Sequence, residues 1–200
     1  KRAVLPAVRV VDAPRFGYRG LHLDVARNFQ PKQTVLRVLD LMGRYKLNAL
    51  HFHVTDDEGW RLEIPGLPEL TDVGARRGHT LNSADFLPPA YGSGPDVDQP
   101  FGSGYFTQND YVGILKYAAA RHIEVIPEIE MPGHARAAIK AMDARFRRLS
   151  ATGDSSGARR YLLSEAEDRS VYRSVQNFPD NVMNPALEST YAFIENVVDG

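Results

Sequence analysis

The sequence predicts an α/β fold built as a (β/α)8 TIM barrel, of which this chain supplies about the first three to four β/α units. Strand patterns alternate with helix patterns, which indicates parallel strands covered by helices. Polar residues cluster where each strand ends, the place where barrel enzymes hold their chemistry. The alternative is an open doubly wound sheet, but nucleotide-binding sheets of that kind have a glycine-rich phosphate turn after the first strand, and this sequence has none there. Because a barrel needs about 250 residues, we expect a partial one.

The first β/α unit is predicted from two different periodicities. Residues 19–26 (RGLHLDVA) alternate Leu21, Leu23 and Val25 with polar residues, the period of two expected for a strand. Residues 31–46 then place apolar side chains three and four positions apart behind a proline, which is well tolerated in a first helical turn.

Two more strands and two more helices follow. A strand is predicted at residues 49–55, a long Pro- and Gly-rich loop at 65–106, and a helix at 107–121 that opens with the capping-box pattern TQND. A third strand is predicted at 123–130, followed by a helix that begins near the MPGH sequence. The last predicted helix, residues 187–198, follows a charged, loop-rich insertion.

Composition excludes several classes of function. The chain has 200 residues, 43% of them hydrophobic, with 24 basic and 25 acidic residues and a net charge of −1. This intermixed charge gives no footprint for nucleic acid, and no apolar run is long enough for a membrane span. With no cysteine, thiolate nucleophiles and cysteine–zinc sites are excluded.

The stretch HFHVTDDEGW raises a metal site as one alternative. His51 and His53 are spaced like a two-histidine clip for zinc or nickel, and His22, His134 and nearby carboxylates could complete it. A metal-dependent amidohydrolase-type barrel would use such a site. The other interpretation is a polar barrel interior in which the histidines hydrogen-bond to carboxylates. The pattern alone leaves both open.

The same stretch carries three consecutive carboxylates. Because neighbours on an extended segment point in opposite directions, Asp56 and Asp57 should diverge, and they cannot serve as a glycosidase pair about 5–9 Å apart. At most one of them enters a site, with Glu58 on its side of the strand. The alternative is a loop whose carboxylates cap the turn at Gly59.

Three further residues have a structural and a functional interpretation. Arg27 is a surface arginine, a partner of Asp24, or a forked donor for ligand hydroxyls. His134 starts a helix, or lies beside Asp56 and tunes a catalytic acid. Trp60 belongs to the core, or packs against a sugar ring.

Four stretches taken together resemble one family. PRFGYRGLHLDVARNF, LDLMGRYKLNALHFHVTDDEGWRLEIPGLPELTDVG, GYFTQNDYVGILKYAAARHIEVIPEIEMPGHARAAI and NPALESTYAFIENVV are similar to the catalytic domain of family 20 glycoside hydrolases, in its bacterial chitobiase branch. The resemblance implies a cofactor-free (β/α)8 barrel that removes terminal β-linked N-acetylglucosamine or N-acetylgalactosamine with retention. In this family the sugar's own 2-acetamido oxygen is the nucleophile, an exception to the two-carboxylate scheme.

The resemblance also implies roles for individual residues. Arg27 matches the arginine that grips the sugar hydroxyls. Asp56 and His134 match the pair that hydrogen-bonds behind the catalytic glutamic acid. His53 and Glu128 match motif positions with supporting roles, and Glu130 stands where aspartate is more usual.

The family's catalytic aspartate–glutamate pair, from a His-x-Gly-Gly-Asp-Glu type strand, is missing from the 200 residues. We therefore expect residues 1–200 to be the N-terminal part of the catalytic barrel and silent alone, with 1–16 a linker from an upstream domain. The expected partner is an N-acetylglucosamine-containing oligosaccharide, and the expected location is the periplasm or the exterior. A non-catalytic sugar-binding module is the remaining alternative.

Overall fold

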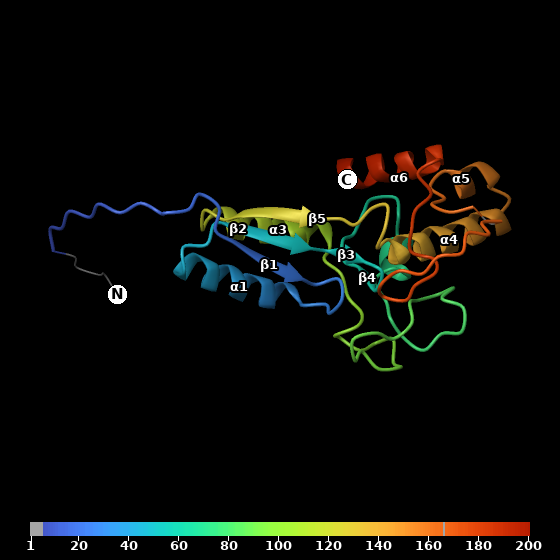
Figure 1. Cartoon of the computed structure of the whole chain (residues 1–200), viewed down its shortest axis with the longest axis horizontal. Coiled ribbons are helices and arrows are strands. Elements are labelled where there is room, and N and C mark those ends of the chain that lie inside the picture. The colour runs from blue at the N-terminus through green and yellow to red at the C-terminus, as the bar shows by residue number, and fades with distance from the viewer. Residues whose placement is uncertain (1–5, 166) are drawn as a thin grey trace.

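The structure is a computed structural model that describes residues 6–165 and 167–200. Figure 1 shows a sheet with helices beside it, and a second group of helices beyond the arrowheads of the strands. The elements in chain order are β1 (Gly20–Asp24), α1 (Lys32–Arg44), β2 (Ala49–His53), β3 (Thr55–Asp56), β4 (Gly59–Trp60), α2 (Glu69–Asp72), α3 (Gln108–Ala119), β5 (Glu124–Glu128), α4 (Arg136–Ala151), α5 (Ser155–Arg159) and α6 (Glu188–Asp199).

The main sheet is parallel, with strand order β1–β2–β5, which confirms the α/β pattern predicted from the sequence. Its register pairs His22 with His51, and His53 with both Asp24 and Glu128. Paired residues in a parallel sheet point to the same face, so these polar side chains share one face of the sheet.

The opposite face is apolar and is covered by α1 and α3. Leu50 and Phe52 of β2 are fully buried there, in one core with Leu39 of α1 and Ile114 of α3. The capping box predicted at the start of α3 is present, because Thr107 and Asp110 each accept the other's backbone N–H. Helices α1 and α3 therefore begin where the sequence pattern placed them, whereas the short α2 lies in the segment predicted as a loop.

A short antiparallel hairpin, β3–β4, follows β2 and was not predicted. The second strand ends at His53 rather than continuing through residue 55, because Thr55 and Asp56 pair with β4 instead. Gly59 is required in this hairpin, since a Cβ there would overlap Arg61 and the carbonyl oxygen of Ala26. The hairpin places the carboxylate stretch beside the ends of the strands.

Trp60 of β4 lies in the core, 1% exposed, as its structural interpretation predicted. Its indole N–H donates to the carbonyl oxygen of Leu62 at 2.7 Å, and its ring meets Phe193 of α6 edge-on. It therefore anchors the last helix to the hairpin.

Two fully buried arginines hold the long loop against the strand ends. Arg61 donates only to backbone carbonyls, five in all, from Val25, Ala26, Ala75, Gly102 and Gly104. Arg77 donates to the carbonyl oxygen of Arg27 at 2.6 Å and to that of Phe101 at 3.3 Å. Burial, and then the charge of Arg77, lowers the pKa of Arg61 to about 9, which leaves it charged at neutral pH.

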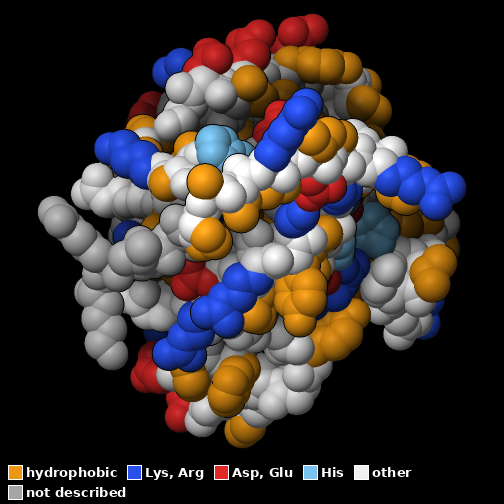
Figure 2. Space-filling model, turned by 90° about the vertical axis from the view of Figure 1, so that its left-hand side faces the viewer, with side chains coloured by type: hydrophobic (Ala, Val, Ile, Leu, Met, Phe, Trp, Pro, Cys, Tyr) orange, Lys and Arg blue, Asp and Glu red, His pale blue; other side chains and the backbone are white. Residues whose placement is uncertain are grey.

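The segment before β1 projects from the sheet as a tail (Figure 1). The linker predicted at 1–16 includes 1–5, which lie outside the described residues, and 6–16 contain no helix or strand. The end of the molecule from which the tail projects carries interspersed acidic, basic and hydrophobic side chains (Figure 2). None of the helices in the described part of the chain has the length and hydropathy needed to span a bilayer.

Candidate active site

Asp56 lies at the centre of a polar cluster where the parallel strands end. Asp56 is 1% exposed, and its carboxylate has one guanidinium group and two imidazole rings as neighbours. Oδ2 lies 2.6 Å from Nη2 of Arg27 and 3.1 Å from Nε2 of His53, and Oδ1 lies 3.3 Å from Nδ1 of His134. One buried carboxylate thus joins residues that follow β1, end β2 and follow β5.

The surroundings of Asp56 keep it ionised. Burial alone would raise its pKa, but His53, the backbone N–H of Asp57 and the charge of Arg27 outweigh burial and hold the pKa below its usual value. Burial likewise opposes the charged form of His53, yet Asp56, Asp24 and Glu128 raise its pKa. The two groups therefore stabilise each other as an ion pair.

Arg27 is tied to more than one carboxylate. Nη1 lies 2.8 Å from Oδ2 of Asp24, and Nε lies 3.8 Å from Oε2 of the buried Glu58. Arg27 pairs with Asp24, as the structural interpretation predicted. Because 24% of its side chain stays exposed, its position also fits a donor for ligand hydroxyls. The exposed part is available to a ligand.

Asp57 and Asp56 do not diverge fully, and the sequence-based expectation that they would was wrong on this point. Oδ2 of Asp57 lies 3.6 Å from His134, so both aspartates meet the same imidazole. The hairpin turn, rather than a continuing extended strand, brings them together. Asp57 also accepts from Asn181 at 2.9 Å and from the backbone N–H of Arg136 at 3.1 Å.

Burial raises the pKa of Asp57, and the contact with Asn181 only partly offsets it. Glu58 lies near Arg27, as Asp56 does, although the extended strand from which this was predicted does not continue past Asp56. Burial, and then the charge of Asp56, raises the pKa of Glu58 to about 7. The three consecutive carboxylates therefore differ in their preference for the proton, which follows from their different neighbours.

His134 is positioned by the turn between β5 and α4. Its backbone has a φ of 53°, a left-handed conformation that non-glycine residues rarely adopt, and a cis peptide bond joins Met131 to Pro132 just before it. The imidazole is 37% exposed on one side and faces both aspartates on the other. It does not start the helix, which begins at Arg136.

Glu128 and Glu130 complete the cluster from β5 and the residues after it. Oε2 of Glu128 lies 3.3 Å from Nδ1 of His53, and Oε1 of Glu130 lies 3.9 Å from Nε2 of the same ring. Burial, and then the charges of Asp56 and Glu128, raises the pKa of Glu130. All six residues singled out from the sequence are thus connected in one network.

The four histidines raised as metal ligands fall in three groups. His22 and His51 lie beside Glu128, His53 lies with Glu128 and Glu130, and His134 lies with Asp56 and Asp57. Each of these imidazoles is next to a carboxylate, which is also what the polar-interior interpretation predicted. Sequence reasoning did not single out Arg61, Arg77 or Asn181, since no local pattern marks a polar residue as buried.

Comparison with known proteins gives the family. The model of the glycosyl hydrolase family 20 catalytic domain matches residues 16–200. The chain is 51% identical over 192 residues to a β-hexosaminidase of Vibrio vulnificus, covering 96% of this chain and 23% of that protein. It is 53% identical over 195 residues to the N,N'-diacetylchitobiase of Vibrio harveyi, covering 97% and 22%.

A solved structure is similar as well. The family 20 exo-β-N-acetylglucosaminidase of Vibrio harveyi, in complex with N-acetylglucosamine, superimposes with a TM-score of 0.79 at 41% identity, over 95% of this chain and 26% of that one. The chain therefore belongs to glycoside hydrolase family 20, as its motifs predicted, and it spans about a quarter of the length of these relatives.

Proposed function

We propose that the protein hydrolyses terminal, non-reducing β-linked N-acetylhexosamine residues, from N-acetylglucosamine-containing oligosaccharides, with retention of configuration. Family membership and the relatives' names, β-hexosaminidase and chitobiase, support this activity. The observation that carries it is the buried Asp56 carboxylate, held between Arg27 and His134. Such glycans are large and polar, so we place the enzyme in the periplasm or outside the cell.

In this proposal β1, β2 and β5 are the first three strands of a (β/α)8 barrel. They are parallel, they follow one another in the sheet in chain order, and helices cover their apolar face. Their carboxyl ends carry the whole Asp56 network, which is where barrel enzymes keep their active sites. Residues 17–200 then form the N-terminal part of the catalytic domain, and 1–16 a linker to an upstream domain.

The nucleophile in this mechanism is the substrate's own 2-acetamido oxygen, which attacks the anomeric carbon and forms an oxazolinium. A nucleophile within the substrate has a high effective concentration, and no protein nucleophile is needed. The acid that protonates the leaving oxygen, and the aspartate that orients the acetamido N–H, belong to a sequence motif outside these 200 residues.

Asp56 and His134 are the supporting pair behind that acid. Asp56 is ionised and lies 3.3 Å from Nδ1 of His134, and an imidazole held in this way can fix the position and the pKa of a neighbouring carboxylic acid. His53 contacts Asp56 directly, and Glu128 and Glu130 lie beside the imidazole of His53. Arg27 directs its exposed N–H groups to the hydroxyls of the sugar.

Substituting the acetamido group of the substrate tests the identity of the nucleophile. The protein at its natural length is assayed with 4-nitrophenyl β-glycosides that carry a 2-acetamido or a 2-trifluoroacetamido group. Fluorine withdraws electrons from the carbonyl oxygen, so kcat/KM should fall steeply with the fluorinated substrate. Equal rates would indicate a protein nucleophile and contradict the proposed mechanism.

A further inference from the structure

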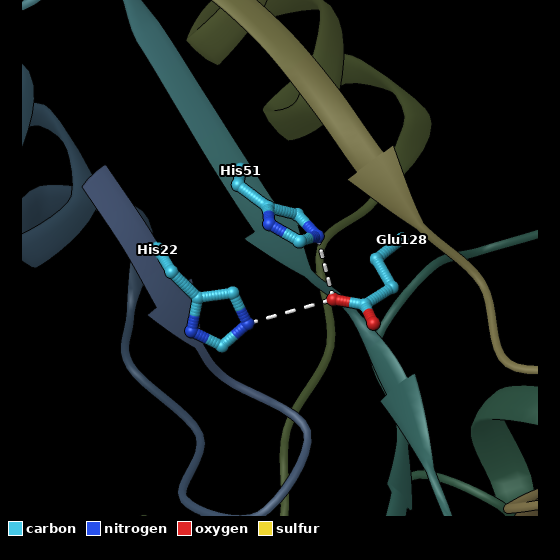
Figure 3. Close-up of side chains that lie close together, drawn as sticks. All are labelled: His22, His51 and Glu128. Atoms are coloured by element: carbon cyan, nitrogen blue, oxygen red, sulfur yellow. Dashed lines mark ion pairs between the residues drawn. The ribbon is translucent and has the colours of Figure 1, made fainter. Parts of the chain in front are cut away.

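Three imidazoles surround a single oxygen atom on the polar face of the sheet. Oε2 of Glu128 lies 2.7 Å from Nε2 of His51, 3.5 Å from Nε2 of His22 and 3.3 Å from Nδ1 of His53. Figure 3 shows His22 on β1, His51 on β2 and Glu128 on β5, converging on a common point. The catalytic proposal uses His53 but gives no role to His22 or His51.

The register of the sheet produces this convergence. His22 is paired with His51 across β1 and β2, and Glu128 is paired with His53 across β2 and β5, so all four side chains point to one face. The rings of His22 and His51 meet edge-on, with their centroids 4.7 Å apart. Backbone pairing, rather than a flexible loop, therefore holds the donor atoms together.

The donor set is suited to a transition-metal ion. Zinc binds imidazole nitrogen and carboxylate oxygen at about 2.0–2.2 Å, which places ligand atoms roughly 3 Å apart. The donor atoms of His22, His51 and Glu128 all lie within 4.8 Å of one another, so small side-chain rotations bring them to that spacing. Oε2 of Glu128 is buried and accepts no well-aligned hydrogen bond among the described residues, which leaves it available to a cation.

Charge also favours a cation at this place. The face carries the carboxylates of Glu128 and Glu130, and the latter lies 3.9 Å from His53. A neutral imidazole pair beside a carboxylate is the common ligand set of open zinc sites.

We propose that His22, His51 and Glu128 bind one divalent transition-metal ion of the zinc type, with solvent in the remaining position. The ion links β1, β2 and β5 across the polar face of the sheet. It is not a reactant in the proposed hydrolysis, and the variants that test it replace His22 and His51, which the proposed hydrolysis does not use.

Calorimetric titration with zinc chloride at neutral pH tests the site, with the untagged protein at its natural length and no substrate present. The wild type should bind one equivalent of zinc. His22→Gln and His51→Gln should each bind no zinc at this site, or bind it at least about tenfold more weakly than the wild type. His79→Gln and His122→Gln are matched controls, since both histidines are exposed and lie outside the cluster, and they should bind zinc as the wild type does.

Thermal unfolding separates loss of the site from loss of the fold. Zinc should raise the Tm of the wild type and of both controls, because a ligand that binds only the folded state stabilises it, and should leave the Tm of the two cluster variants unchanged. The proposal is overturned if the wild type binds no zinc, or if His22→Gln and His51→Gln bind the same number of ions with the same affinity as the controls.

Discussion

Asp56 and His134 face each other across the ends of two strands, with Oδ1 of the aspartate 3.3 Å from Nδ1 of the imidazole. The aspartate belongs to the hairpin after β2, and the histidine to the turn after β5. The contact therefore joins segments 78 residues apart in sequence (134 − 56). The His134 side chain stays 37% exposed, so part of the imidazole is not covered by the two aspartates.

Replacing the Asp56 carboxylate tests the supporting pair. Asp56→Asn keeps the size of the side chain but removes its charge, so kcat for 4-nitrophenyl N-acetyl-β-glucosaminide should fall by roughly 100-fold, the usual scale of a well-placed acid–base contribution. Asp40→Asn is the control, because Asp40 pairs with Arg121 between α1 and α3, away from the cluster. A wild-type kcat for Asp56→Asn would rule out the assigned role.

Two histidines with the same unusual backbone allow a matched test of His134. His122 has a φ of 56° and His134 a φ of 53°, and asparagine tolerates this left-handed conformation better than most residues. His134→Asn should lower kcat while circular dichroism and Tm stay close to those of His122→Asn. Equal kcat in the two variants would show that the imidazole of His134 has no part in the reaction.

Glu58 predicts a specific dependence of stability on pH. Burial, and then the charge of Asp56, raises its pKa from 4.5 to about 7, so the folded state holds this proton more tightly than the unfolded state. The folded protein therefore loses stability as pH rises from about 4.5 to about 7. Glu58→Gln has no carboxyl group to titrate at this position, so it does not lose this stability. The free energy of unfolding of the variant minus that of the wild type should therefore increase from about pH 4.5 to about pH 7, by at most about 3 kcal/mol.

Urea titrations at a series of pH values measure this difference. Glu195→Gln on α6 is the control, since Glu195 is exposed whereas Glu58 is buried. A Glu58→Gln difference that shrinks as pH rises would mean that the ion pair with Arg27 outweighs burial.

Arg61 predicts the largest loss of stability. Arg61→Met fills similar space but leaves five backbone carbonyls without their donor, and a buried group left unsatisfied costs about 1–3 kcal/mol. The free energy of unfolding should therefore fall by at least about 3 kcal/mol. Arg121→Met removes a partly exposed pair with Asp40 and should cost no more than about 1 kcal/mol. Equal losses in the two variants would contradict the structural role of Arg61.

Local patterns predicted the sheet and its helices because each element carries its own periodicity. Leu50 and Phe52 alternate with His51 and His53, and the structure buries the first pair under α1 and α3 while the second faces the polar side. The capping box at Thr107 depends on two residues three apart, so it too can be seen in the sequence. The same is true of the gathering of polar residues at the strand ends.

Contacts between distant segments could not be predicted in this way. Asn181 donates a hydrogen bond to Asp57, 124 residues away in sequence. Arg61 donates hydrogen bonds to backbone carbonyls both at the strand end and in the long loop. Arginine and asparagine are mostly exposed in proteins, so their residue types suggest the surface rather than the interior. A turn at Gly59 was raised as an alternative, but the contact of both aspartates with His134 was not predicted, because their side chains were expected to lie on an extended segment.

The most direct test of the central claim is release of nitrophenol from 4-nitrophenyl N-acetyl-β-glucosaminide by residues 1–200 alone and by the protein at its natural length. Turnover at natural length, with none from residues 1–200, is the predicted result, because in the proposed mechanism Asp56 and His134 support an acid from outside this segment. Turnover by residues 1–200 alone would contradict the account and make Asp56, Asp57 and Glu58 the reaction centre.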